Sequence, residues 1–252
     1  MATSISEIKS QFNSLQTAQI PAFIEQYSDD DRAGVAALVK KAAKQYADYE
    51  KEVARTQRML LFEHEYAAYS AICGIDEVGR GPLAGPVMAG AVILPKDMNI
   101  LYLNDSKQLS EKKREELYDV IIKEAVAVGI GEVSNERIDE INILNATYEA
   151  MRMAIQNLGI VPDILLNDAV TIPGVSIRQI PIIKGDAKSA SIAAASIVAK
   201  VTRDRLMVRL DTKYPGYGFA GNKGYGSAQH IEAIKKLGPT PIHRRSFIGN
   251  FI

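Results

Sequence analysis

The chain has 252 residues, 47% of them hydrophobic and 24% charged, and its 30 basic residues balance its 30 acidic ones. This composition excludes a disordered or low-complexity chain. A single cysteine, Cys73, excludes a disulfide framework and is typical of a reducing compartment. No apolar run reaches the roughly 20 residues of a membrane-spanning helix, and the first residues lack the pattern of a secretion signal. We therefore expect a cytoplasmic protein that does not bind membranes.

Residues 1–69 predict an N-terminal helical extension. Ser4-Ile5-Ser6-Glu7 fits a capping box. A short helix is predicted to end at a break near Pro21, and the apolar residues from Val35 to Tyr46 recur at helical spacing. No catalytic motif lies in this part of the chain, so we expect it to be structural or to bind a partner.

From residue 70 onward, predicted strands alternate with predicted helices. We expect strands at 71–78, 86–94, 129–133, 163–167 and 175–182. We expect helices at 110–128, 142–158, 187–211 and 227–237. This order predicts an α/β domain over residues 70–252, with a mixed sheet and helices packed on it.

Acidic residues stand at the ends of predicted elements. Asp76 and Glu77 end an apolar strand, where each buried charge costs several kcal/mol unless it is paired or bound to a metal. Neighbours in a strand point to opposite faces, so Asp76 and Glu77 cannot both lie on one solvent-exposed face. The alternative to a functional role is a strand end whose acids form salt bridges. Asp168 also ends a strand, and Asp186 precedes a helix, where each taken alone is typical of a turn or an N-cap.

Two glycine-rich segments stand out. Gly79, Gly81 and Ala84 have the spacing of a dinucleotide-binding motif, but that motif opens a helix and a strand is expected here. A tight turn that approaches a phosphate or sugar, or an ordinary turn, fits better. Residues 214–226 interleave aromatic and basic side chains, which can stack on a nucleic acid or pack on the core.

Charge is uneven along the chain. Residues 178–252 hold 13 Lys/Arg against 4 Asp/Glu, a net charge of +9, and the remainder carries −9. A polyanionic partner and solvated helix faces both explain this excess. The three histidines, His64, His230 and His243, show no metal-ligand spacing.

Together these segments resemble bacterial ribonuclease HII. The matching words occur in family order over about residues 72–247: Gly74-Ile75-Asp76-Glu77-Val78-Gly79-Arg80-Gly81-Pro82-Leu83-Ala84-Gly85-Pro86, Asn104-Asp105-Ser106-Lys107, Gly185-Asp186-Ala187-Lys188-Ser189, Ala199-Lys200-Val201-Thr202-Arg203-Asp204, Lys223-Gly224-Tyr225-Gly226 and His243-Arg244-Arg245-Ser246-Phe247. The sister family, ribonuclease HIII, has Gly-Lys-Gly in place of Gly79-Arg80-Gly81.

The resemblance implies an RNase H-like fold and hydrolysis of the RNA strand of RNA–DNA hybrids. It also implies cleavage 5′ to ribonucleotides embedded in duplex DNA, leaving a 3′-hydroxyl and a 5′-phosphate. The family's catalytic, metal-binding acids fall on Asp76, Glu77, Asp168 and Asp186. The family usually has glycine after the third acid, where this chain has Ala169. Two Mg²⁺ or Mn²⁺ ions, which prefer oxygen ligands, would make four neighbouring carboxylates tolerable.

The resemblance further implies a monomer that binds hybrid and ribonucleotide-containing duplexes. By motif position, the substrate-binding residues are Gly79, Arg80, Gly81, Lys107, Lys188, Ser189 and Tyr225. In this interpretation the glycine turn senses the 2′-hydroxyl, Tyr225 packs on the neighbouring deoxyribose, and the basic last third holds the DNA. Two alternatives remain open: a hybrid-binding protein without catalysis, and a dinucleotide-dependent oxidoreductase that uses Gly79, Gly81 and Ala84.

Overall fold

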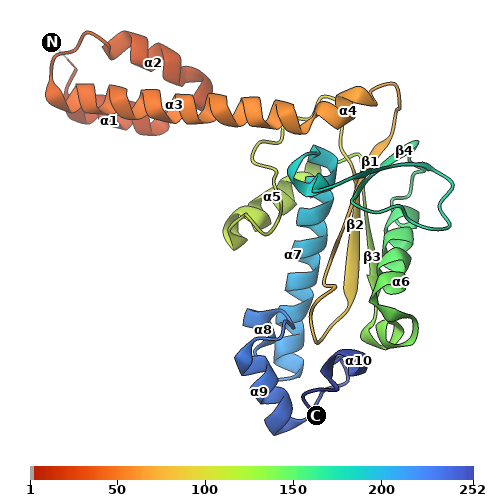
Figure 1. The fold of residues 1–252 in the computed structure, drawn as a ribbon. Coiled ribbons are helices and arrows are strands. Elements are labelled where there is room, and N and C mark those ends of the chain that lie inside the picture. The colour runs from red at the N-terminus through yellow and green to blue at the C-terminus, as the bar shows by residue number, and fades with distance from the viewer. Residues whose placement is uncertain (1–2) are drawn as a thin grey trace. The chain divides into compact units, whose positions relative to one another are not determined.

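The structure is a computed structural model that describes residues 3–252. The chain forms two compact units that divide after Arg58 (Figure 1). Within residues 3–252, no helix is both long and apolar enough to span a membrane.

The first unit consists of helices. These are α1 (Ile5–Ser14), a 3₁₀ turn (Thr17–Gln19), α2 (Ile20–Tyr27) and α3 (Ala33–Met59), which runs across the boundary. The predicted capping box is present, since Ser4 Oγ accepts from the Glu7 N–H and Glu7 accepts from the Ser4 N–H. The predicted break near Pro21 is present, since α1 ends at Ser14 and α2 begins at Ile20. Pro21 lies in the first turn of α2, where its missing N–H costs no helical hydrogen bond.

The second unit contains a mixed sheet, as the sequence predicts, and its five strands lie in the order β3-β2-β1-β4-β5. Its strands are β1 (Ile72–Val78), β2 (Val87–Ile93), β3 (Ala127–Val133), β4 (Ile164–Asp168) and β5 (Arg178–Ile182). β2 pairs antiparallel with β1 and β3, whereas β4 pairs parallel with β1 and β5. The parallel pair β1–β4 places the carboxyl ends of two strands side by side at one edge of the sheet.

The helices of the second unit are α4 (Leu61–Glu65), α5 (Glu111–Glu124), α6 (Asn135–Gln156), α7 (Ala190–Lys213), α8 (Phe219–Asn222), α9 (Ala228–Leu237) and α10 (Arg245–Ile248). The short α8 and α10 were not predicted, because four residues show no helical period, whereas α4 falls within the predicted helical extension. Helix α6 begins seven residues before its predicted start at Asn142. Asn142 has φ 65° and interrupts α6, and its side chain accepts from the Asn145 N–H, so it caps the second half of this helix.

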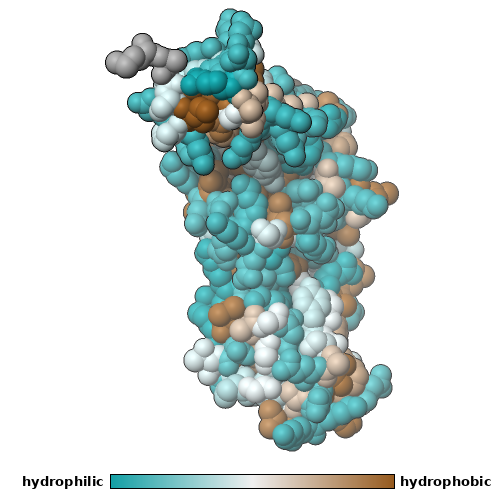
Figure 2. Space-filling model, turned by 90° about the vertical axis from the view of Figure 1, so that its left-hand side faces the viewer, coloured by the Kyte–Doolittle hydropathy of each residue, from teal (hydrophilic) through white to brown (hydrophobic). Residues whose placement is uncertain are grey.

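Helices cover both faces of the sheet (Figure 1): α6 packs on one face and α7, with α5 beside it, on the other. Glycines in the strands allow this close packing. A Cβ at Gly90 would lie 2.5 Å from the Ala195 carbonyl oxygen of α7, and one at Gly131 would lie 1.9 Å from the Ala150 carbonyl oxygen of α6. The alanine- and serine-rich start of α7 therefore lies directly on the strand backbones. On the face drawn in Figure 2, hydrophilic residues predominate, since most large apolar side chains are in the cores.

Candidate active site

Two of the predicted acids lie side by side at the end of the sheet. The parallel register of β1 and β4 pairs Ile75 with Asn167, so that the following residues, Asp76 and Asp168, are neighbours. Gly74 lies against Ser191 of α7, and because side chains alternate along a strand, Asp76 points to the same face. Asp76 is buried and Glu77, on the opposite face, is only partly so.

The acid before α7 joins this pair. Asp186 lies in the 3₁₀ turn Gly185–Ala187 and is buried. The Gly185 N–H donates to Asp168 Oδ1 at 2.7 Å and ties this turn to the end of β4. Asp186 is not the N-cap of α7, since Ser189 holds that position. Residues from β1, β4 and the turn before α7 thus converge at one edge of the sheet.

Repulsion among these carboxylates shows in their protonation equilibria. Burial, followed by the charges of Glu77 and Asp168, raises the pKa of Asp76 well above its ordinary value. Burial also raises the pKa of Glu77, where Asp168 adds to the effect and Arg80, 3.6 Å away, opposes it. Burial, Asp105 and Asp168 raise the pKa of Asp186. The acids are therefore close enough to destabilise one another's charge.

This set of donors fits a divalent cation. Among residues 3–252, no three His, Cys, Asp or Glu side chains are already arranged as a metal site. The donors are nevertheless carboxylate oxygens, the ligands that Mg²⁺ and Mn²⁺ prefer. Without a cation, protonation of the acids reduces the repulsion among them; a bound cation would reduce it while the acids stay ionised. The residues that would hold the cation are Asp76, Glu77, Asp168 and Asp186.

A loop that follows β2 brings Lys107 to the same acids. Burial acts to lower the pKa of Lys107, but Asp105, Asp76, Asp186 and Glu77 together raise it. Asp105 itself accepts from the Lys107 N–H at 2.9 Å. Asp105 is thus a fifth acid near the site that we did not assign, although it stands in the recognised word Asn104-Asp105-Ser106-Lys107.

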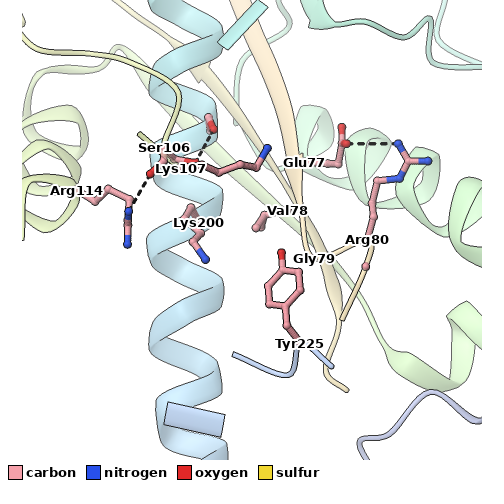
Figure 3. Close-up of a pocket in the computed structure, with 11 residues that line it drawn as sticks. Glu77, Val78, Gly79, Arg80, Ser106, Lys107, Arg114, Lys200 and Tyr225 are labelled. Carbon is pink, nitrogen blue, oxygen red and sulfur yellow. Dashed lines mark hydrogen bonds and ion pairs between the residues drawn. The ribbon is translucent and has the colours of Figure 1, made fainter. Parts of the chain in front are cut away.

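One of the four acids, Glu77, lines a cavity of about 560 Å³. It is lined by Glu77, Val78, Gly79, Arg80, Gly81, Ser106, Lys107, Arg114, Ser196, Lys200 and Tyr225. Figure 3 shows Lys107 and Lys200 at one side, Arg80 paired with Glu77 at the other, and the Tyr225 ring pointing between them. We did not predict Arg114, Ser196 or Lys200, because ordinary charged or small helix residues give no local signal of a cavity.

Two predicted substrate contacts lie elsewhere. Lys188 is exposed and does not line the cavity. Ser189 is fully buried: its hydroxyl donates to Glu63 at 2.7 Å and accepts from the Ile192 N–H. Ser189 thus caps α7, and any effect it has on a substrate passes through that helix.

Two buried arginines hold the glycine turn and the tyrosine loop together. Arg203 donates to the carbonyls of Ala84, Pro86 and Lys223, and Arg244 donates to those of Gly79, Arg80 and Gly85. Burial lowers the pKa of Arg203; burial and the charge of Arg203 lower that of Arg244 to about 9. Six carbonyl oxygens therefore solvate two guanidinium groups, and their bonds fix both loops at the cavity.

The structure resolves two of the alternatives that the sequence leaves open, one for the glycine motif and one for the aromatic loop. The dinucleotide-binding interpretation is wrong, because β2 and not a helix follows Ala84. For the aromatic loop at 214–226, the sequence allowed packing on the core or exposure for stacking on a nucleic acid, and different residues of the loop do each. Tyr217 and Phe219 belong to a hydrophobic core, whereas Tyr225 is 41% exposed and lines the cavity.

The mixed sheet, its covering helices and the acids at its edge define an RNase H-like protein. Ribonuclease H2 from Pyrococcus horikoshii has a similar fold, with TM-score 0.58 and 30% identity over 72% of this chain and 98% of that chain. The RNase HII in a complex with PCNA from Archaeoglobus fulgidus has TM-score 0.58 and 27% identity over 71% and 96% of the two chains. The predicted fold is confirmed.

Sequence comparison identifies the family. Residues 73–250 match Ribonuclease HII, and residues 4–67 match the Ribonuclease HII N-terminal domain. Ribonuclease HII of Lachnoclostridium phytofermentans is 63% identical over 99% of this chain and 98% of its own. That of Bacillus subtilis is 52% identical over 96% and 95%. The chain belongs to the ribonuclease HII family, as the resemblance predicts, and is a ribonuclease H enzyme.

Replacing Asp76 with asparagine is expected to stabilise the metal-free protein. Because the folded state raises the pKa of Asp76, it binds this proton more tightly than the unfolded chain does. Stability is therefore lost as pH rises through the interval between the two pKa values. Asp76→Asn removes this loss. The free energy of unfolding of the variant should therefore exceed that of the unchanged protein by near zero at about pH 4 and by about 1–3 kcal/mol at about pH 8.

Thermal unfolding in the presence of EDTA measures this gain. Asp119→Asn is the matched control, because that side chain is 76% exposed. An Asp76→Asn gain that is equal at both pH values would contradict the expectation.

The two glycines of the turn are expected to respond differently to alanine. A Cβ at Gly79 would lie 2.3 Å from Arg203 Nε, and this residue has φ +88°. A Cβ at Gly81 meets only the Tyr225 ring, at 3.8 Å. Gly79→Ala should therefore destabilise the fold by about 2 kcal/mol or more, and Gly81→Ala by less than about 0.5 kcal/mol. Denaturant unfolding compares the two, and equal losses would contradict the tight packing of Arg203 on Gly79.

Proposed function

We propose that this enzyme hydrolyses the RNA strand of RNA–DNA hybrids and cuts duplex DNA 5′ to an embedded ribonucleotide. The products would be a 3′-hydroxyl and a 5′-phosphate. The convergence of Asp76, Glu77, Asp168 and Asp186 beside a cavity that Tyr225 and the glycine turn border is the observation that carries the proposal. Membership of the ribonuclease HII family supports it.

The four acids are the proposed ligands of two divalent cations, Mg²⁺ or Mn²⁺. When bound, such ions activate a water molecule for attack on a phosphodiester and stabilise the charge that develops on the leaving oxygen. The chain itself orients the carboxylates through the β1–β4 register and through the bond from Gly185 to Asp168. Lys107, which faces the acids, would place a positive charge beside the phosphate to be cut.

The turn and the tyrosine are the proposed recognition elements. Gly81 has no side chain and borders the Tyr225 ring, so that a sugar can approach the backbone of the turn closely. We assign recognition of the 2′-hydroxyl to Gly79, Arg80 and Gly81, and packing on the next deoxyribose to Tyr225.

The rest of the chain has supporting roles in this proposal. Lys188 would contact the backbone from its exposed position, within a region whose net charge of +9 attracts a polyanion. Catalysis belongs to residues 70–252, and we assign no chemistry to the helices that precede them. We further propose that the enzyme acts as a cytoplasmic monomer, and the single buried cysteine Cys73 supports a reducing compartment.

A labelled DNA duplex with one ribonucleotide, with and without Mg²⁺, tests the proposed reaction. Cleavage should require the metal. Asp76→Asn should reduce it by about 100-fold or more, because it removes a ligand charge at the reacting phosphate, while Asp119→Asn cleaves normally. Cleavage that persists in EDTA, or an Asp76→Asn enzyme that keeps a tenth of the activity, would contradict the assignment. Tight binding without any cleavage would instead favour a hybrid-binding protein.

The Tyr225 ring is expected to be needed more than its hydroxyl. Tyr225→Ala should lower kcat/KM at a single embedded ribonucleotide by about tenfold or more, because a ring–sugar contact of about 1–3 kcal/mol is lost. Tyr225→Phe keeps the ring and should stay within about threefold of the unchanged enzyme. Steady-state cleavage of the same duplex measures both, and equal losses in the two variants would refute a packing role.

A further inference from the structure

Two histidines that lack metal-ligand spacing in the sequence form a buried pair beside the tyrosine loop. His230 lies on α9, and His243 lies in the segment before α10. Their side chains are 0% and 1% exposed, and their Nε2 atoms are 3.1 Å apart. Neither imidazole reaches the cavity, so their role is not direct contact with the substrate.

The hydrogen bonds of the pair allow one arrangement of protons. The Thr240 N–H donates to His243 Nδ1 at 2.9 Å, so this nitrogen is an acceptor and the proton of His243 is on Nε2. His243 Nε2–H then donates to His230 Nε2, which leaves His230 Nδ1–H to donate to the Tyr225 carbonyl at 2.8 Å. The bonds run in one direction from Thr240 to Tyr225 and need both rings to be neutral.

The surroundings of the pair keep it neutral. The rings of Tyr217 and Phe219 pack against both imidazoles, with centroids 5.2–6.4 Å apart. Burial lowers the pKa of His230, and burial together with the charges of His230 and Arg245 lowers that of His243 to about 4. The arrangement therefore persists at neutral pH.

The Tyr225 side chain depends on its backbone for its direction. The ring is 41% exposed, so packing alone does not fix it. Lys223, two residues earlier, has φ +52°, a left-handed conformation that costs a residue with a Cβ free energy, so the surrounding fold has to hold it. The Tyr225 carbonyl accepts from the Ser227 N–H and from His230, and through His230 it is linked to His243 in the segment before α10.

We propose that His230 and His243 are positioning residues, which hold the backbone of Tyr225 so that its ring stands at the substrate cavity. The inference rests on the sugar contact proposed above for Tyr225. It assigns the pair no contact with the reacting atoms.

Replacing a histidine with asparagine or with glutamine tests its two ring nitrogens separately, because the asparagine amide lies near the position of Nδ1 and the glutamine amide near that of Nε2. At His230, asparagine places an amide N–H where Nδ1 donates to Tyr225, whereas glutamine reaches only the position of Nε2. His230→Gln should therefore lower kcat/KM on the single-ribonucleotide duplex about tenfold, and His230→Asn should remain within about threefold. At His243 the opposite ranking is expected. His243→Gln should lose less kcat/KM than His243→Asn, because glutamine supplies the N–H that donates to His230 and asparagine does not.

The expected result is that asparagine is the better replacement at His230 and glutamine the better replacement at His243. General destabilisation predicts no such reversal, so the same order at both positions would overturn the proposal. If one variant fails to fold in a thermal melt, the comparison at the other position still gives an order to test.

A double-mutant cycle tests whether the effect passes through Tyr225. If it does, His230→Gln should cost less than about twofold when added to Tyr225→Ala, because the ring that it positions is already absent. Multiplicative losses of the two substitutions would overturn the proposal.

Fluorescence provides a measurement that does not depend on cleavage. The chain contains no tryptophan, so Tyr225→Trp introduces a single indole at the cavity. Acrylamide quenching of this indole should increase in the His230→Gln background and not in the His230→Asn background. Equal quenching in the two backgrounds overturns the positioning role. A difference in quenching together with equal cleavage by all variants would instead reject the sugar contact proposed for Tyr225.

Discussion

Repulsion among buried carboxylates is the constraint that the rest of this site has to satisfy. Asp76 is buried at the end of β1, next to Glu77 in the chain and to Asp168 across the sheet. Burial and these neighbours oppose its ionisation, so the fold spends stability to hold the group. Two features keep the carboxylates together despite that cost: the ladder of β1 and β4, and the Gly185 N–H that donates to Asp168. The ladder is made by the backbone alone and does not depend on the charge of the acids, whereas the Gly185 bond ends on the Asp168 carboxylate itself.

Buried positive charge stabilises the other side of the cavity. Arg203 and Arg244 are fully buried and bind backbone carbonyls. A guanidinium group has donors in a rigid fork, so each arginine can hold three carbonyls: Arg244 holds three within the turn, and Arg203 joins Ala84 and Pro86 to the distant Lys223. The turn that carries Arg80 and the loop that carries Tyr225 are thereby joined, and their substrate-facing groups keep a fixed separation. The His230–His243 pair adds a neutral link to the same loop.

Local pattern predicted the strands and the acids but not the way in which they meet. Apolar runs defined the five strands, and period-two alternation separated Asp76 from Glu77. The contact of Asp76 with Asp168 depends on parallel pairing of strands that are some ninety residues apart, which no local window contains. Tyr217 and Tyr225 stand in the same aromatic and glycine-rich segment, yet one is in the core and the other borders the cavity. Their difference is set by tertiary packing, and so is the meeting of His230 with His243.

The one departure from the family pattern at an acid has a structural explanation. Ala169, where the family usually has glycine, has φ 56°, a left-handed conformation that costs a residue with a Cβ roughly 1 kcal/mol. Its N–H donates to the Ile182 carbonyl at 3.0 Å, so the chain continues the pairing of β4 with β5 one residue past Asp168. Ala169 is exposed, and its methyl group therefore adds strain without a buried clash. Asp168 keeps its position because the sheet on one side and Gly185 on the other fix it, and the strain falls on the residue that follows.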